Sequence, residues 1–222
     1  TELARAAKEY AAIDAFYIAD GHHRAASANR VRDLRRNSGT NSDSSERFLV
    51  VVFPEDQLEI LAYNRVVADL NGKRWEDFLE AAKENFEISA PGANPVPEKA
   101  RSFCAYHKGE WRLFSARSHA LKEEDPVGRL DVALLQDLLL APELGIDDPR
   151  RNQRIQFVGG IRGTSELEKL VNEGADDAIA FSMYPTSIQE LFAVADSGEV
   201  MPPKSTWFEP KLRSGLLIHP ID

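Results

Sequence analysis

The order of apolar and polar positions along the chain predicts alternating strands and helices. Short apolar runs bounded by turn-forming residues indicate strands, and apolar residues that recur every three or four positions indicate helices. The predicted strands are residues 13–19, 48–53, 58–63, 86–89, 102–107, 110–115, 154–158 and 177–183. The predicted helices are residues 1–12, 22–36, 75–82, 130–140, 165–172 and 187–195.

Between residues 86 and 117 the pattern changes, because short strands follow one another without a helix. Lys108 and Gly109 separate two of these strands and predict a tight hairpin turn. Elsewhere strands alternate with helices. The sequence therefore predicts an α/β or α+β fold, with a mixed sheet, flanking helices and an antiparallel hairpin.

The domain organisation has two interpretations. A polar stretch around Pro126 favours a boundary between a portion of residues 1–117 and a second α/β portion, residues 118–222, packed on it. A single domain with one continuous sheet fits the same pattern. The first predicted helix resembles a helix entered in the middle of a protein, so we expect that a further segment precedes residue 1.

Composition and charge narrow the function classes. Apolar residues make up 43% and charged residues 28% of the 222 residues, which is typical of a globular protein. The formal net charge of −9 disfavours nucleic acid and anionic membranes as main partners. Cys104 is the sole cysteine and cannot form an internal disulfide, and no apolar run is long enough to span a bilayer. We therefore expect a cytoplasmic protein.

The best candidate for chemistry is the turn of residues 20–24, between a predicted strand and a predicted helix. Backbone N–H groups at a helix start are unsatisfied and attract anions. Gly21 permits close approach of a ligand, Arg24 could clamp a phosphate, and His22 and His23 add donors or proton carriers. Asp20 could hold Mg²⁺, accept a substrate proton, or simply cap the helix.

Three segments carry a resemblance to a known family. They are Tyr-Ile-Ala-Asp-Gly-His-His-Arg at 17–24, Tyr-Asn-Arg-Val-Val at 63–67 and Met-Pro-Pro-Lys-Ser-Thr-Trp-Phe-Glu-Pro-Lys at 201–211. Together they resemble a bacterial family known as domain of unknown function 1015, of which this chain would be the carboxy-terminal portion.

The 20–24 turn is also similar, more distantly, to the phosphate-binding turn of the ParB/sulfiredoxin superfamily. That resemblance implies a ParB/sulfiredoxin-like element within residues 1–117. The superfamily includes free-serine kinases with an Asp-Gly-His-Thr-Arg signature, in which this chain has His23 at the threonine position. His22 occupies the position of the catalytic cysteine of sulfiredoxins, which argues against that activity.

Two further segments offer groups for a phosphate or a nucleotide. In the carboxy-terminal run, Lys204 and Lys211 could neutralise phosphate charge, Ser205 and Thr206 could donate hydrogen bonds, and Trp207 could stack on a base. The alternative is a surface tail with Trp207 in the core. Arg65 follows a predicted strand and could face a ligand or form a surface ion pair.

The sequence thus leaves two hypotheses open. The first is a kinase that uses Mg²⁺ with ATP or ADP to phosphorylate a small hydroxyl metabolite such as serine, with Asp20, His22 and His23 in catalytic roles. The second is a regulator that binds a nucleotide or phosphometabolite without turnover. The oligomeric state has no signal in the sequence.

Overall fold

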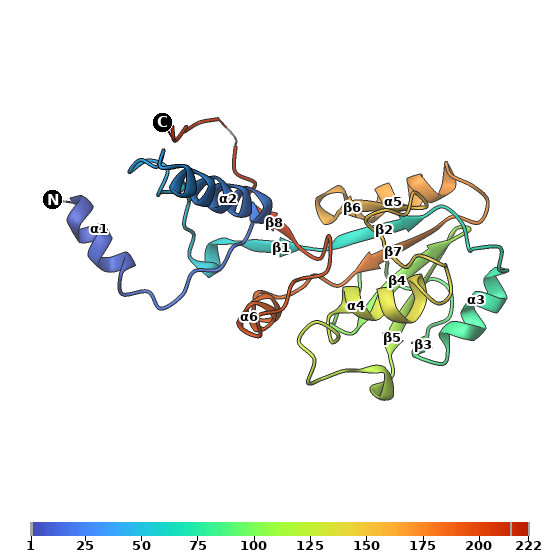
Figure 1. Ribbon diagram of the computed structural model, residues 1–222. Coiled ribbons are helices and arrows are strands. Elements are labelled where there is room, and N and C mark those ends of the chain that lie inside the picture. The colour runs from blue at the N-terminus through green and yellow to red at the C-terminus, as the bar shows by residue number, and fades with distance from the viewer. Residues whose placement is uncertain (1, 214, 222) are drawn as a thin grey trace. The chain divides into compact units, whose positions relative to one another are not determined.

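The protein consists of two compact units. The terminal unit comprises Thr1–Leu58 and Pro210–Asp222, and the central unit comprises Glu59–Glu209. The computed structural model, shown in Figure 1, describes residues 2–213 and 215–221. In the described chain, the terminal unit contains helices α1 (Glu2–Tyr10) and α2 (His22–Ser38), and the central unit contains the strands.

The central unit is built on a six-stranded sheet with the order β3-β5-β4-β7-β2-β6. Each of its strand pairs is antiparallel. A two-stranded antiparallel sheet joins β1 to β8 in the same unit. The strands are β1 (Glu59–Leu61), β2 (Tyr63–Val67), β3 (Phe86–Ile88), β4 (Ser102–His107), β5 (Glu110–Ala116), β6 (Ile155–Gly159), β7 (Ile179–Met183) and β8 (Trp207–Glu209). The six-stranded sheet therefore contains strands from both sides of residues 117–129.

Helices cover both faces of the six-stranded sheet. Successive residues of a strand point to opposite faces, so Phe103 packs in one core cluster and Cys104 in the other. The first cluster includes residues of α3 and α4, and the second includes residues of α5, which lies on the opposite side of the sheet in Figure 1. The helices are α3 (Trp75–Ala82), α4 (Asp131–Leu135), continued by a π-helix at Gln136–Leu140, α5 (Gly163–Asn172) and α6 (Ile188–Asp196). The expected α/β architecture with flanking helices is confirmed.

The predicted hairpin is confirmed in detail. His107 pairs with Glu110 at the end of the β4–β5 ladder, which leaves two residues in the turn. Lys108 has a φ of 47° and Gly109 a φ of 86°. Two successive positive φ angles are what a type I′ turn requires, and its twist matches that of the flanking strands.

Two of the predicted buried strands are wrong. Residues 13–19 and 48–53 carry no strand, and most of their large apolar side chains are exposed, with Phe16 55% and Val50 61% accessible. An apolar run shows a preference for burial but does not supply a partner, and a strand exists only when a neighbour satisfies its backbone hydrogen bonds. Within the described residues, no segment pairs with either run.

The predicted single strand over residues 58–63 is also corrected, because the structure divides this region between two sheets. β1 pairs with β8, and β2 begins at Tyr63 and pairs with β6 and β7. The chain changes sheet at Ala62, whose carbonyl accepts a hydrogen bond from the Gly160 N–H at 2.8 Å. The alternating pattern of 58–63 gave no sign of this change.

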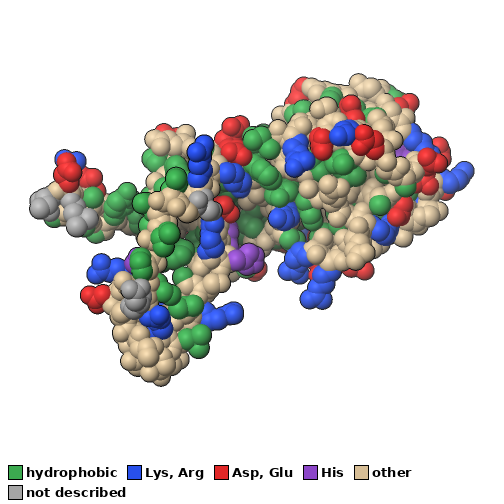
Figure 2. Space-filling model, turned by 90° about the horizontal axis from the view of Figure 1, so that it is seen from above, with side chains coloured by type: hydrophobic (Ala, Val, Ile, Leu, Met, Phe, Trp, Pro, Cys, Tyr) green, Lys and Arg blue, Asp and Glu red, His purple; other side chains and the backbone are tan. Residues whose placement is uncertain are grey.

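The surface carries charges of both signs. Figure 2 shows Lys and Arg side chains interspersed with Asp and Glu side chains over the visible face. Among the helices of the described chain, none has the length and apolar character needed to cross a bilayer.

The core contacts of the sheet predict a large cost for truncating Phe181. Its side chain is fully buried and meets Phe103 edge to face, with ring centroids 5.9 Å apart. We expect Phe181→Ala to lower the free energy of unfolding by about 3–5 kcal/mol, from lost burial and the cavity left behind. Urea unfolding would measure this. Val96→Ala, at a side chain 54% exposed, is the control and should cost less than about 0.5 kcal/mol.

Candidate functional site

In the terminal unit, the amino terminus of α2 has no side-chain cap among the described residues. Gly21 is the N-cap residue with φ 87° and ψ 24°, a left-handed conformation that side chains disfavour. Because the helix has no such cap, the predicted capping role of Asp20 is not observed. Instead, the Asp20 carboxylate accepts a hydrogen bond from the Gly21 N–H at 2.9 Å. The N–H groups of the first helical turn are therefore left without a side-chain acceptor.

Arg24 lies directly over Gly21. A Cβ atom at position 21 would come within 2.8 Å of Arg24 Nη2 and 2.9 Å of Nε, so a side chain there would displace the flexible guanidinium from this position. Arg24 Nη2 also lies 3.9 Å from Asp20 Oδ2, and both side chains are largely exposed. An exposed ion pair at this distance is weak, so the guanidinium can exchange Asp20 for another anion at small cost.

The two histidines of the turn, His22 and His23, occupy the first two positions of α2 and are both exposed. Adjacent helical residues point about 100° apart, so the two rings face different directions. In the described part of the chain, no three His, Cys, Asp or Glu side chains are grouped to hold a metal ion. A metal at Asp20 would therefore need ligands from a bound molecule.

A second basic group forms in the central unit. Arg65 on β2 is 3% exposed and Lys204 lies in the loop before β8, and Arg65 Nη2 donates to the Lys204 carbonyl at 3.2 Å. Arg65 Nη1 donates to the Tyr63 carbonyl, and the guanidinium carbon lies 5.5 Å from the centre of the Phe157 ring. Burial lowers the pKa of Arg65 to about 9. Within the described residues no carboxylate pairs with this buried cation, so the surface ion pair considered for Arg65 is not formed.

The loop that carries Lys204 is held in a strained conformation. Lys204 has a φ of 56°, which is uncommon for a residue with a side chain, and its ammonium lies 5.5 Å from the Tyr63 ring centre. The Ser205 hydroxyl donates to the Pro202 carbonyl at 2.6 Å, and the Ser205 carbonyl accepts from Thr186 Oγ1 at 3.2 Å. Such strain persists only where surrounding contacts enforce it, and it is often found at functional sites.

The remaining residues of this run differ in their surroundings. The Trp207 ring packs over Gly159, meets the Tyr63 ring with centroids 5.4 Å apart, and donates from Nε1 to Glu209 Oε1 at 2.7 Å. Its indole is therefore engaged within the protein. Thr206 is half-buried, and Lys211 is exposed and belongs to the terminal unit.

The structure thus sorts the predicted site residues into two groups. Asp20, Gly21, His22, His23 and Arg24 form one turn in the terminal unit. In the central unit, Arg65 on β2 lies beside residues that follow it by more than a hundred positions. These are Lys204, Ser205 and Thr206 in the loop before β8, and Trp207 at the start of β8.

One charged cluster has no counterpart in the sequence-based predictions. Arg101 Nη1 lies 2.9 Å from Glu190 Oε1 and 3.4 Å from Asp131 Oδ2, while Asp131 Oδ1 is buried without a partner among the described residues. Burial raises the pKa of Asp131 to about 7, helped by the nearby Glu190 charge and opposed by Arg101. The available signal was an aspartate inside the apolar run of residues 130–140.

Comparison with known proteins identifies relatives of the chain. A family model described as "Protein of unknown function (DUF1015)" matches residues 1–133. A search of curated proteins found no match.

Among solved structures, a free serine kinase in complex with AMP has 15% identity and a TM-score of 0.47, covering 89% of this chain and 68% of its own. A conserved hypothetical protein from Pyrococcus furiosus has 14% identity and a TM-score of 0.47, covering 89% and 71%. SbnI with a carboxy-terminal truncation, from Staphylococcus aureus, has 16% identity and a TM-score of 0.41, covering 75% and 55%.

The raised pKa of Asp131 makes stability depend on pH. Between pH 4 and pH 7 the unfolded chain has lost this proton while the folded protein retains it, so the stability that Asp131 contributes falls as pH rises through that window. Asp131→Asn does not titrate. We therefore expect its free energy of unfolding, relative to wild type, to improve from pH 4.5 to pH 8 in urea titrations. Asp137→Asn, at an exposed carboxylate, should lack this trend, and a pH-independent difference for Asp131→Asn would contradict the assignment.

Proposed function

This chain belongs to the family described as protein of unknown function DUF1015, and we propose that it binds the phosphates of a nucleotide at the 20–24 turn. The proposal goes on to phosphoryl transfer from ATP or ADP to a small hydroxyl metabolite such as serine. The observation that carries it is the start of α2, where Gly21 is left-handed, no side chain of the described chain caps the helix, and Arg24 lies over the glycine.

The physical basis is the match between this turn and a phosphate group. Free N–H groups at the start of a helix point toward a bound anion, and the helix dipole favours its negative charge. The Arg24 guanidinium supplies paired donors with the geometry of phosphate oxygens. Binding would replace the 3.9 Å contact between Arg24 and Asp20 by a closer, charge-assisted one. The free serine kinase structure named above contains AMP, which is a ligand of this class.

Asp20 and the two histidines have separate proposed roles. Once Arg24 turns to phosphate, Asp20 is available to hold Mg²⁺ together with phosphate oxygens, which is how Mg²⁺ is commonly bound, or to accept the proton of the substrate hydroxyl. His22 and His23 would contact the transferred phosphoryl group from the first turn of α2. Phosphoryl transfer depends mainly on positioning and charge neutralisation, which these residues can supply.

The basic group of the central unit is a second, separate candidate for binding an anion. A buried guanidinium without a carboxylate is costly, so Arg65 is suited to an anion that approaches from the loop side. Lys204 would add a second positive charge beside Tyr63, with Thr206 as a hydroxyl donor. Ser205 would have to give up its hydrogen bond to the Pro202 carbonyl to donate to a ligand. In this group Trp207 could stack on a base only after leaving its packing over Gly159. Lys211 belongs to the terminal unit and would neutralise phosphate charge there.

One observation favours the alternative of a regulator that binds without turnover. Asp20, the sole carboxylate of the 20–24 turn, is already engaged by the Gly21 N–H and by Arg24. A catalytic base in a phosphoryl transferase must instead be free to accept the proton of the hydroxyl nucleophile. Binding and turnover therefore need separate tests.

The binding test compares two arginines of α2. Calorimetric titration of ADP with Mg²⁺ should give an affinity that Arg24→Ala lowers at least tenfold, since a charge-assisted hydrogen bond contributes about 1.5–3 kcal/mol. Arg30→Ala removes the same charge from a position further along the same helix, away from its start. It should leave the affinity within about twofold of wild type. Equal losses of affinity in the two variants would show that ADP responds only to the net positive charge of α2, and would contradict a specific contact with Arg24.

The turnover test distinguishes kinase from regulator. The nucleotide that binds best is incubated with serine and other small alcohols, and phosphorylated product is measured by mass spectrometry. Product that forms with wild type and is lost in Asp20→Asn supports the kinase. Tight binding without product from any alcohol would support the regulator.

The strained backbone of Lys204 offers a test that separates function from stability. Lys204→Gly removes the ammonium but relieves a positive φ, so we expect a free energy of unfolding within about 1 kcal/mol of wild type. Affinity for inorganic phosphate or ADP should nevertheless fall. Lys108→Gly is the matched control, because Lys108 is also a lysine with positive φ in the same unit and should not affect anion binding. Unchanged affinity in Lys204→Gly would remove Lys204 from the proposed site.

A further inference from the structure

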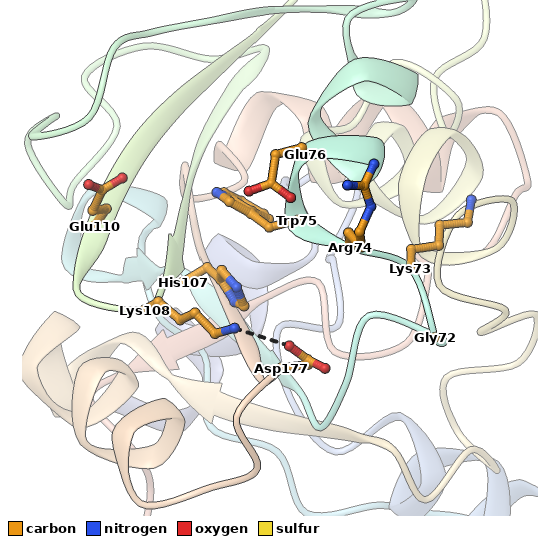
Figure 3. Close-up of a pocket in the computed structure, with 9 residues that line it drawn as sticks. All are labelled: Gly72, Lys73, Arg74, Trp75, Glu76, His107, Lys108, Glu110 and Asp177. Atoms are coloured by element: carbon orange, nitrogen blue, oxygen red, sulfur yellow. Dashed lines mark hydrogen bonds and ion pairs between the residues drawn. The ribbon is translucent and has the colours of Figure 1, made fainter.

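A pocket of about 490 Å³ lies at one end of the central sheet. The loop before α3 and the first turn of α3 form one wall, while the β4–β5 hairpin and the loop before β7 form the other. Figure 3 shows His107 between the Trp75 indole and the side chains of Lys108 and Asp177. All of these residues belong to the central unit, so the pocket does not depend on the 20–24 turn.

His107 is the unusual feature of the pocket wall. It is 2% exposed, and its ring lies against the Trp75 ring with centroids 4.7 Å apart. Its Nδ1 is 3.0 Å from the Ala178 carbonyl, whereas its Nε2 has no hydrogen-bond partner among the described residues. Buried polar atoms without a partner are rare in folded proteins and call for an explanation.

The protonation state of His107 follows from its contacts. A carbonyl oxygen only accepts hydrogen bonds, so Nδ1 carries the hydrogen and donates it to Ala178. Burial lowers the pKa of His107, despite opposing contributions from the Ala178 carbonyl, Asp177 and Glu76, so the ring is neutral at pH 7. Nε2 therefore bears a lone pair, and the partner that satisfies it must be a donor.

The charges around the pocket indicate the sign of the ligand. The three cations are each paired with a carboxylate, Lys73 with Glu143, Arg74 with Asp77 and Lys108 with Asp177. Glu110 lies 3.5 Å from Arg112. Glu76, on the first turn of α3, forms no ion pair with any residue that the structure describes. The pocket thus combines an unsatisfied acceptor with a carboxylate that forms no ion pair among the described residues, and both features favour a positively charged donor.

We propose that this pocket binds a small molecule through a primary ammonium group, which donates a hydrogen bond to His107 Nε2 and is neutralised by Glu76. An ammonium group is the simplest group that supplies both a donor and a positive charge. Free amino acids and simple alkylamines share this chemistry. Lys108 at the rim would favour an amino acid over an alkylamine if its ammonium also contacts the ligand carboxylate.

The test compares ligands that have an N–H donor with one that has the same charges but no N–H. Protein labelled with ¹⁵N in its histidine rings is titrated with glycine, with glycine betaine, which has no N–H, and with ethylammonium chloride at constant ionic strength. We expect the Nε2 resonance of His107, assigned by its loss in His107→Gln, to shift with glycine and not with betaine. Ethylammonium distinguishes the sources, since a response to it equal to that of glycine identifies the amine alone as the ligand.

A substitution at the rim tests the charge. Glu76→Gln should weaken glycine or ethylammonium binding about tenfold or more, as expected for loss of a charged partner. Glu80→Gln lies on the same helix, where Glu80 pairs with Lys83, and should leave binding unchanged. Both sites are exposed, so these variants should fold even if His107→Gln does not. Equal responses to glycine and betaine, no Nε2 shift with any amine, or binding insensitive to Glu76→Gln would overturn the proposal. None of these results depends on nucleotide binding.

Discussion

The pairing of β4 with β7 at the centre of the six-stranded sheet is the contact on which the rest of the central unit depends. Four residue pairs join the two strands, from Phe103 opposite Met183 to Tyr106 opposite Ala180. Both strands are buried along their whole length, because helices cover both faces of the sheet. The ends of β4 therefore lie at fixed positions. Arg101, with its two carboxylate partners, precedes the strand, and His107 at the other end faces the pocket.

The two basic groups show different ways of presenting positive charge. Arg24 is exposed and only loosely held by Asp20, so its guanidinium can turn to a ligand without breaking a strong contact. Arg65 is buried, fixed by two carbonyls and an aromatic ring, and its position is set before any ligand arrives. The first arrangement suits a turn that closes on phosphate. The second suits a preorganised contact, which costs little entropy on binding.

Local signals in the sequence were sufficient for some elements and not for others. The hairpin was predictable because Lys108 and Gly109 specify a turn, and α2 because its residues include no glycine or proline. Residues 48–53 have the composition of a central strand but no partner in the described chain, since pairing depends on residues elsewhere. Arg65 and Lys204 were both predicted as site residues. Their contact joins positions 139 residues apart, so the sequence pattern did not predict that they lie side by side.

The roles of His107 and Asp131 could not be predicted, because their chemistry comes from burial. His107 ends an ordinary strand sequence, and only the structure shows that one ring nitrogen is satisfied and the other is not. Asp131 stands out in an apolar run, but the run alone does not reveal Arg101 and Glu190 beside it. Perturbed groups of this kind arise where the fold removes water from a polar atom, which is a property of three-dimensional packing.

The central claim is that nucleotide phosphates bind at the open start of α2, and backbone amide NMR tests it most directly. Uniformly ¹⁵N-labelled protein is titrated with ADP and Mg²⁺, and the amide shifts are followed residue by residue. The account predicts that the amides of Gly21, His22, His23 and Arg24 shift most within the terminal unit, because the N–H groups of the first helical turn, which follows Gly21, would donate to phosphate oxygens. Saturable binding that leaves these four amides unmoved would contradict it and place the nucleotide elsewhere.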